Sequence, residues 1–154
     1  MRLAAYIGEY EMDQVILDLG LNVNFLPKQT WEQMGRPALQ WSSIQLRIMN
    51  QKKIILMERL QGVTVDIEGA SALADFEVIG IMDRYLALLG IYWPTYMNGV
   101  INLKKWKMIF EKKSLLIVVP LDPAEGSRYT KPVRDYESDD DLDCIYMIIV
   151  RDQD

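Results

Sequence analysis

The feature that most constrains this chain is a series of short apolar segments rich in β-branched residues. Turn-forming glycines, among them Gly62, Gly69 and Gly80, punctuate the chain. Such segments are typical of β-strands, and they do not form long amphipathic helices. We therefore expect a mostly-β domain whose strands pair with partners distant in the sequence. The expected strands are 3–7, 14–17, 44–49, 54–60, 63–68, 74–79 and 107–111.

One short helix is expected at residues 30–35. Thr30 would cap its first turn, Gln33 stands three residues later as in a capping box, and Gly35 would end it.

The composition excludes several common types of catalytic site. The 154 residues include no histidine and one cysteine, Cys144. Ser-His-Asp and Cys-His catalysis, His-containing zinc sites, Cys-based metal cages and an intrachain disulfide are therefore excluded. We expect no cofactor and no metal. The net charge of -5 also disfavours binding to nucleic acid or to an anionic membrane.

The first residues lack the apolar core of a signal peptide, and no apolar run approaches the roughly 18 residues that a membrane span needs. With one cysteine, the chain fits a reducing cytoplasmic or nuclear setting.

The composition changes near residue 120, so we expect a domain at 1–120 and an acidic linker with a terminal apolar strand at 121–154. Prolines and carboxylates crowd the linker, and the carboxylates lack the glycine and terminal glutamate of a calcium-binding loop. Residues 145–150 are a strong strand former. A bare apolar edge promotes aggregation, so this strand should pair with another.

The segment 15–27 carries the most informative chemistry. An apolar strand runs into Asp18, Gly20 follows, and the chain turns apolar again. A carboxylate at a buried strand end is costly unless it is hydrogen-bonded or has a partner. On local grounds alone, Asp18 could equally be a turn residue that accepts hydrogen bonds from nearby backbone N–H groups.

The order of these parts resembles the retropepsin-like aspartic proteases, and more narrowly those in the polyproteins of plant long-terminal-repeat retrotransposons. The resemblance spans roughly residues 3–119. Residues 15–20 look like the strand that delivers the catalytic aspartate, and 100–110 like the closing strand pair. The resemblance implies that the active-site loop consists of Asp18, Leu19 and Gly20. It also implies that the tip of the flap hairpin consists of Met49, Asn50, Gln51 and Lys52, and that the motif behind the active site, here called the backing motif, consists of Leu88, Leu89 and Gly90.

In that family each subunit supplies one aspartate, so the resemblance implies a homodimer with Asp18 as the catalytic residue. Two carboxylates a few ångström apart share a proton, one acting as a base on water and the other as an acid. This chemistry needs no histidine and no cofactor. A single Asp-Leu-Gly unit in the chain agrees with a dimer of the retroviral kind.

The chain departs from active members of the family near the site. Leu19 replaces the usual Thr or Ser and offers no hydroxyl, although plant retroelement members often carry leucine there. The flap tip at 49–52 contains no glycine, and Ile91 follows Gly90 where a polar residue is common. Pro94 restricts the residue before it, which disfavours the short helix expected there.

We therefore predict a retroelement-derived, catalytically impaired module that dimerises and binds proteins, with an active homodimeric aspartic endopeptidase as the alternative. A regulatory or harmful effect exerted through a host partner is a third possibility. The expected partners are a second copy and an unidentified protein or peptide. No nucleic acid or membrane partner is expected, because the net charge is negative. The lysines at 104–107 and 112–113 form only a short basic patch, which we interpret as a solvated strand end.

Overall fold

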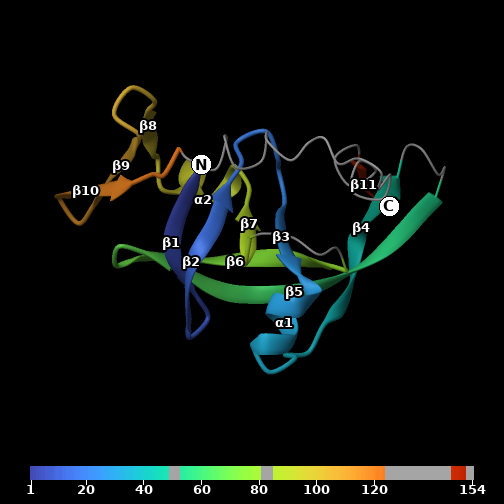
Figure 1. The fold of residues 1–154 in the computed structure, drawn as a ribbon. Coiled ribbons are helices and arrows are strands. Elements are labelled where there is room, and N and C mark those ends of the chain that lie inside the picture. Colours follow the sequence, from blue (N-terminus) through green and yellow to red (C-terminus); the bar gives the residue numbers. More distant parts are fainter. Residues whose placement is uncertain (49–52, 81–84, 124–146, 152–154) are drawn as a thin grey trace.

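The computed structural model describes residues 1–48, 53–80, 85–123 and 147–151 (Figure 1). These residues form a mostly-β fold with short helices, as the sequence predicts. The strands are β1 (Arg2–Ile7), β2 (Tyr10–Leu17), β3 (Asn24–Pro27), β4 (Gln40–Ile48), β5 (Lys53–Ile67), β6 (Ala70–Ile79), β7 (Ala87–Leu89), β8 (Val100–Asn102), β9 (Lys107–Lys112), β10 (Leu115–Pro120) and β11 (Met147–Arg151). The helices are α1 (Lys28–Gln33) and α2 (Tyr92–Tyr96).

Six strands close into a barrel. They follow the order β1-β2-β7-β3-β6-β5, and β1 pairs with β5 to complete the ring. The inner face carries fully buried aliphatic and aromatic side chains, including Ile7, Leu17, Leu26, Val65 and Phe76. Each such side chain contributes about 1.5–3 kcal/mol when it leaves water, so this interior holds the ring together.

β5 corrects one prediction. Residues 54–60 and 63–68 were expected as two strands, but they belong to one strand that pairs with β4, β6 and β1. Gly62 has φ +70° and lies where the register with β6 shifts between Leu60 and Val63. Glycine adopts this backbone conformation without the strain that a Cβ would cause. It therefore makes an irregularity inside the strand and not a turn.

The predicted start of α1 is also wrong. The helix begins at Lys28, directly after Pro27, and no side chain caps it. Pro27 provides extended backbone with φ -60°, and Thr30 is buried inside the helix. The expected end is confirmed, because Gly35 has φ +89° and its N–H donates to Glu32 O.

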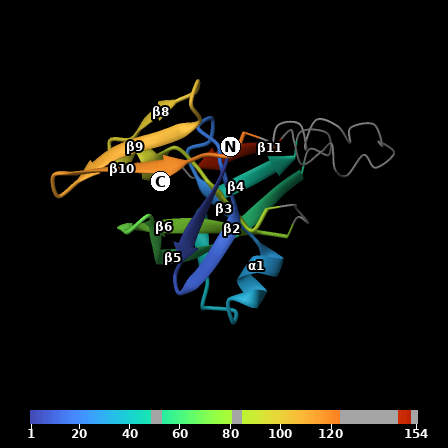
Figure 2. The same cartoon turned by 60° about the vertical axis from the view of Figure 1, so that its left-hand side comes forward.

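Strands β8, β9 and β10 form a second sheet beside the barrel (Figure 2). One face of it packs on the main core through Met108, Phe110 and Val119. Trp93 of α2 meets Phe110 edge to face, with ring centroids 5.6 Å apart at 82°. The packed chain continues past β10, because Leu121 lies in the core and Asp122 forms an ion pair with Arg2.

The expected terminal strand is present as β11, which runs antiparallel to β4 from Met147 opposite Ile48 to Arg151 opposite Ile44. The backbone edge of β4 that faces away from β5 is thus covered by the same chain. Most of the expected acidic linker, and Cys144 beside the terminal strand, fall on residues 124–146, which lie outside the described residues. None of the helices described is long and apolar enough to cross a membrane.

Candidate functional site

Asp18 is the first residue after β2 and is half-buried. β7 runs parallel to β2, with Leu17 opposite Leu89, and the Asp18 N–H donates to Leu89 O at 3.0 Å. The predicted backing motif therefore lies next to the predicted active-site loop, although some 70 residues separate them in the sequence.

The Asp18 loop is a tight turn held by the aspartate itself. The Gly20 N–H donates to Asp18 Oδ1 at 2.9 Å, and the Leu21 N–H donates to Asp18 O at 3.3 Å. Asp18 thus acts as a turn residue, the alternative that the sequence left open. This hydrogen bond is compatible with the catalytic position that the resemblance implies for Asp18, because an accepted hydrogen bond also orients a carboxylate. Leu19 is 36% exposed and brings no hydroxyl to the loop.

Gly90 fixes the distance between the backing motif and the loop. A Cβ at this position would lie 2.4 Å from Val23 O and 2.8 Å from Leu21 O, which no side chain tolerates. The neighbouring Ile91 N–H donates to Leu21 O at 2.8 Å. The position requires glycine because the two backbones approach so closely. Despite Pro94, α2 follows directly, since proline is tolerated in the first turn of a helix.

Asn24 is a structural residue that sequence reasoning missed. Its side chain is buried, its Oδ1 accepts the Gly90 N–H at 2.8 Å, and its Nδ2 donates to Asp75 O at 3.0 Å. It joins β3, β6 and the residue after β7. The one available signal was an amide between the apolar residues Val23 and Phe25.

The Met1 amine interacts electrostatically with the Asp18 carboxylate. Burial lowers the pKa of this amine, the carboxylates of Asp18 and Asp122 oppose that shift, and Arg2 adds to it. A partly desolvated amine therefore stands near the candidate catalytic carboxylate. The predicted flap residues Met49, Asn50, Gln51 and Lys52 lie outside the described residues.

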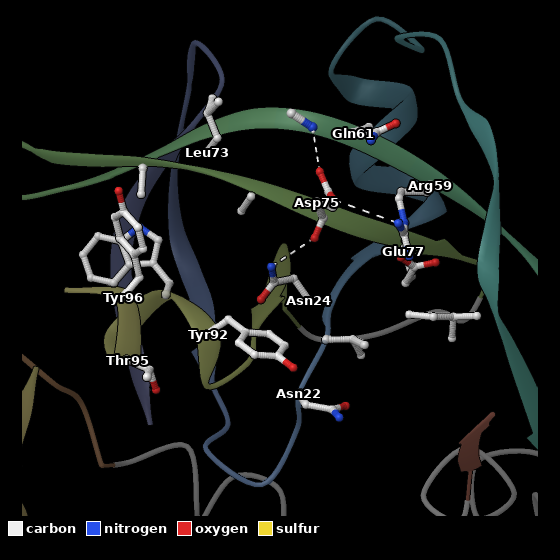
Figure 3. A pocket seen from close by; sticks show the side chains of 16 residues that line it. Asn22, Asn24, Arg59, Gln61, Leu73, Asp75, Glu77, Tyr92, Thr95 and Tyr96 are labelled. Carbon is white, nitrogen blue, oxygen red and sulfur yellow. Dashed lines mark hydrogen bonds and ion pairs between the residues drawn. The ribbon is translucent and has the colours of Figure 1, made fainter. Parts of the chain in front are cut away.

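A groove with a volume of about 740 Å³ opens beside this site, between the β5–β6 pair, α2 and the segment after the Asp18 loop (Figure 3). Its charged residues are Arg59, Asp75 and Glu77. Arg59 Nε donates to Glu77 Oε2 at 2.8 Å, and Asp75 Oδ2 lies 4.0 Å from Arg59. The sequence did not predict this groove, because its lining comes from segments far apart. Glu77 within an apolar strand was the one signal.

Across the described ranges, no group of three or more Cys or carboxylate side chains could hold a metal ion. The arrangement at Asp18 offers a carboxylate and backbone groups. It would serve acid–base chemistry once a second carboxylate faces it.

Comparisons with known proteins support the fold assignment. No protein-family model matches the chain, and a search of curated proteins finds no relative. Among solved structures, the chain is similar to the retroviral protease-like domain of Ddi1 from Leishmania major, with a TM-score of 0.56 and 18% identity over 81% of this chain and 92% of that one. The barrel thus has a retropepsin-like fold, as expected. The comparisons do not extend the resemblance to plant retrotransposons.

Proposed function

We propose that this chain is a retropepsin-fold protein-interaction module that forms a homodimer and has impaired cleavage at Asp18. We assign the dimerising domain to residues 1–120 and give 121–154 an accessory role, and we place the protein in the cytoplasm or nucleus. Descent from a plant retroelement belongs to the same proposal.

The second sheet is the observation that carries the interaction role. While its inner face packs on the core, Val100, Leu116 and Val118 are 64%, 69% and 43% exposed. Val118 and Val100 both stand opposite Ile109, so they share the outer face. β8 and β10 are the outermost strands of this sheet among the described residues. Contiguous exposed apolar side chains mark a protein interaction site.

Sedimentation equilibrium tests the dimer. We expect a concentration-dependent dimer, and we expect Leu116→Glu to weaken its association because a charge would have to enter the apolar contact. Ile54→Glu is the matched control, since Ile54 is an exposed strand residue on β5, outside this sheet. A chain that stays monomeric at every concentration, or a dimer that Leu116→Glu leaves unchanged, would overturn the proposed interface.

The alternative function is an active aspartic endopeptidase. The observation that favours it is the set of hydrogen bonds that holds Asp18 against Leu89 and Gly20. In a dimer, one Asp18 would deprotonate the attacking water while the other, protonated, would donate to the scissile carbonyl oxygen. Sharing one proton requires acidic conditions. This alternative predicts peptide cleavage with an acidic optimum that Asp18→Asn abolishes, and equal turnover by both proteins would end it.

A further inference from the structure

One carboxylate oxygen in the groove lacks a hydrogen-bond donor. The Glu77 side chain is 3% exposed, and its Oε2 accepts from Arg59 Nε. Its Oε1 is buried and has no partner in the part of the chain that the structure describes. Buried polar atoms are nearly always paired, so an unpaired oxygen at a groove wall indicates that a donor comes from outside the fold.

The charge around this oxygen is unbalanced. Arg59 faces two carboxylates, at 2.8 Å from Glu77 and 4.0 Å from Asp75. Asp75 Oδ1 is already occupied by the Gly62 N–H at 2.8 Å. These are the only charged residues among those that line the groove, so the wall carries an excess of one negative charge. A cationic donor would satisfy Oε1 and balance this charge.

The other side of the groove is aromatic. Tyr92 and Tyr96 of α2 are 54% and 74% exposed. Leu73 is 73% exposed and lies on β6, the strand that also carries Asp75 and Glu77. In Figure 3, Tyr92 and Asn22 lie on one side, while Asp75, Arg59 and Glu77 lie on the other. Tyrosine faces suit the aliphatic stem of a basic side chain and attract its charge.

We propose that this groove binds an extended peptide segment through a lysine or arginine side chain that donates to Glu77 Oε1. A neighbouring apolar side chain of the peptide packs on Tyr96 and Leu73. This inference rests on the proposed interaction function in one respect, which is that the partner is a protein. It adds the chemistry by which that partner is recognised. Binding requires neither cleavage by Asp18 nor the outer face of the second sheet. The groove's volume of about 740 Å³ falls within the range of about 300–1,000 Å³ typical of ligand sites.

The test titrates the full chain with the blocked tetrapeptide acetyl-Ala-Lys-Leu-Ala-amide and with the same peptide carrying norleucine for lysine, by calorimetry and amide NMR. We expect the lysine peptide to shift amides in 72–77 and 92–96 and to bind at least about tenfold more tightly, as one charge-assisted hydrogen bond implies. Absence of binding, or equal affinity for both peptides, would overturn the proposal.

Variants locate the contact. Glu77→Gln keeps the shape and should weaken lysine-peptide binding at least about tenfold. The matched control Glu58→Gln, on an exposed β5 carboxylate, should change nothing. Tyr96→Ala alters an exposed residue and leaves the core intact, so it reports on binding even where Glu77→Gln unfolds; unchanged affinity in Tyr96→Ala would contradict the groove. Leu116→Glu should still bind the peptide, which separates failure of this proposal from failure of the dimer.

Discussion

At the scale of single residues, the approach of Gly90 to the backbone of the Asp18 loop limits which residues the site accepts. We predict that Gly90→Ala lowers the free energy of unfolding by about 3 kcal/mol, because a methyl group 2.4 Å from Val23 O forces the strands apart. Gly80→Ala is the control, since a Cβ there meets nothing within 4 Å. Urea unfolding measures both. Equal stabilities would mean that the loop and the backing motif are not held this closely.

Leu19 is the residue at which cleavage should be recoverable. If its missing hydroxyl limits activity, Leu19→Thr should raise peptide cleavage by about tenfold or more, the value of one additional hydrogen bond between the active-site loops. Leu19→Val is the control, because it is β-branched without a hydroxyl. A matching gain in Leu19→Val would assign the effect to side-chain shape, and no gain in either would place the impairment elsewhere.

The Arg59–Glu77 ion pair should stabilise the fold as a unit. Arg59 is 22% and Glu77 3% exposed, so removing the cation leaves a buried carboxylate without its partner. We expect Arg59→Met to destabilise the chain by about 3 kcal/mol, and a second change, Glu77→Met, to recover most of that loss. Denaturant unfolding of the single and double variants gives the coupling. Additive losses would contradict the pairing.

Sequence reasoning predicted some of the important residues and missed others. It identified Asp18 and Gly90 because a strand end and a hydrophobic-hydrophobic-Gly motif are local patterns. It missed Asn24 and Glu77, because their roles depend on partners 66 and 18 residues away. An isolated polar residue in an apolar run signals such a role without revealing its partner.

At the scale of elements, β11 covers the edge of β4 that β5 leaves open. Deleting residues 124–154 should therefore speed hydrogen exchange of those amides in 44–48 that point away from β5, by about tenfold or more, because they lose their strand partner. Amides of β6 serve as the internal reference. Unchanged exchange at β4 would mean that β11 does not pair there in solution.

The elements that sequence reasoning missed or misplaced have physical reasons. β3 and β7 are four and three residues long, too short for a period of two to stand out, and they are strands because neighbours on both sides complete their hydrogen bonds. Thr30 looked like a helix cap, but it is buried inside α1, which begins two residues earlier at Lys28.

At the scale of the whole molecule, strand order could not be read from composition or periodicity. Parallel pairing of β2 with β7 depends on a ring closed by β1 and β5, and no local pattern encodes that closure. The resemblance to retropepsins implied the fold but not this strand order, and the similarity to a solved structure with a TM-score of 0.56 supports the fold. The groove remained unseen for the same reason, because it exists only once β5, β6 and α2 come together.

We propose that the retropepsin fold persists here as a dimeric binding module with little remaining cleavage. The most direct measurement is peptide cleavage in acidic buffer by the wild-type chain and by Asp18→Asn, at a concentration where sedimentation shows the dimer. We predict indistinguishable, background turnover by both proteins. Clear cleavage by the wild-type dimer that disappears in Asp18→Asn would contradict the impaired-cleavage proposal and identify the protein as a working aspartic endopeptidase.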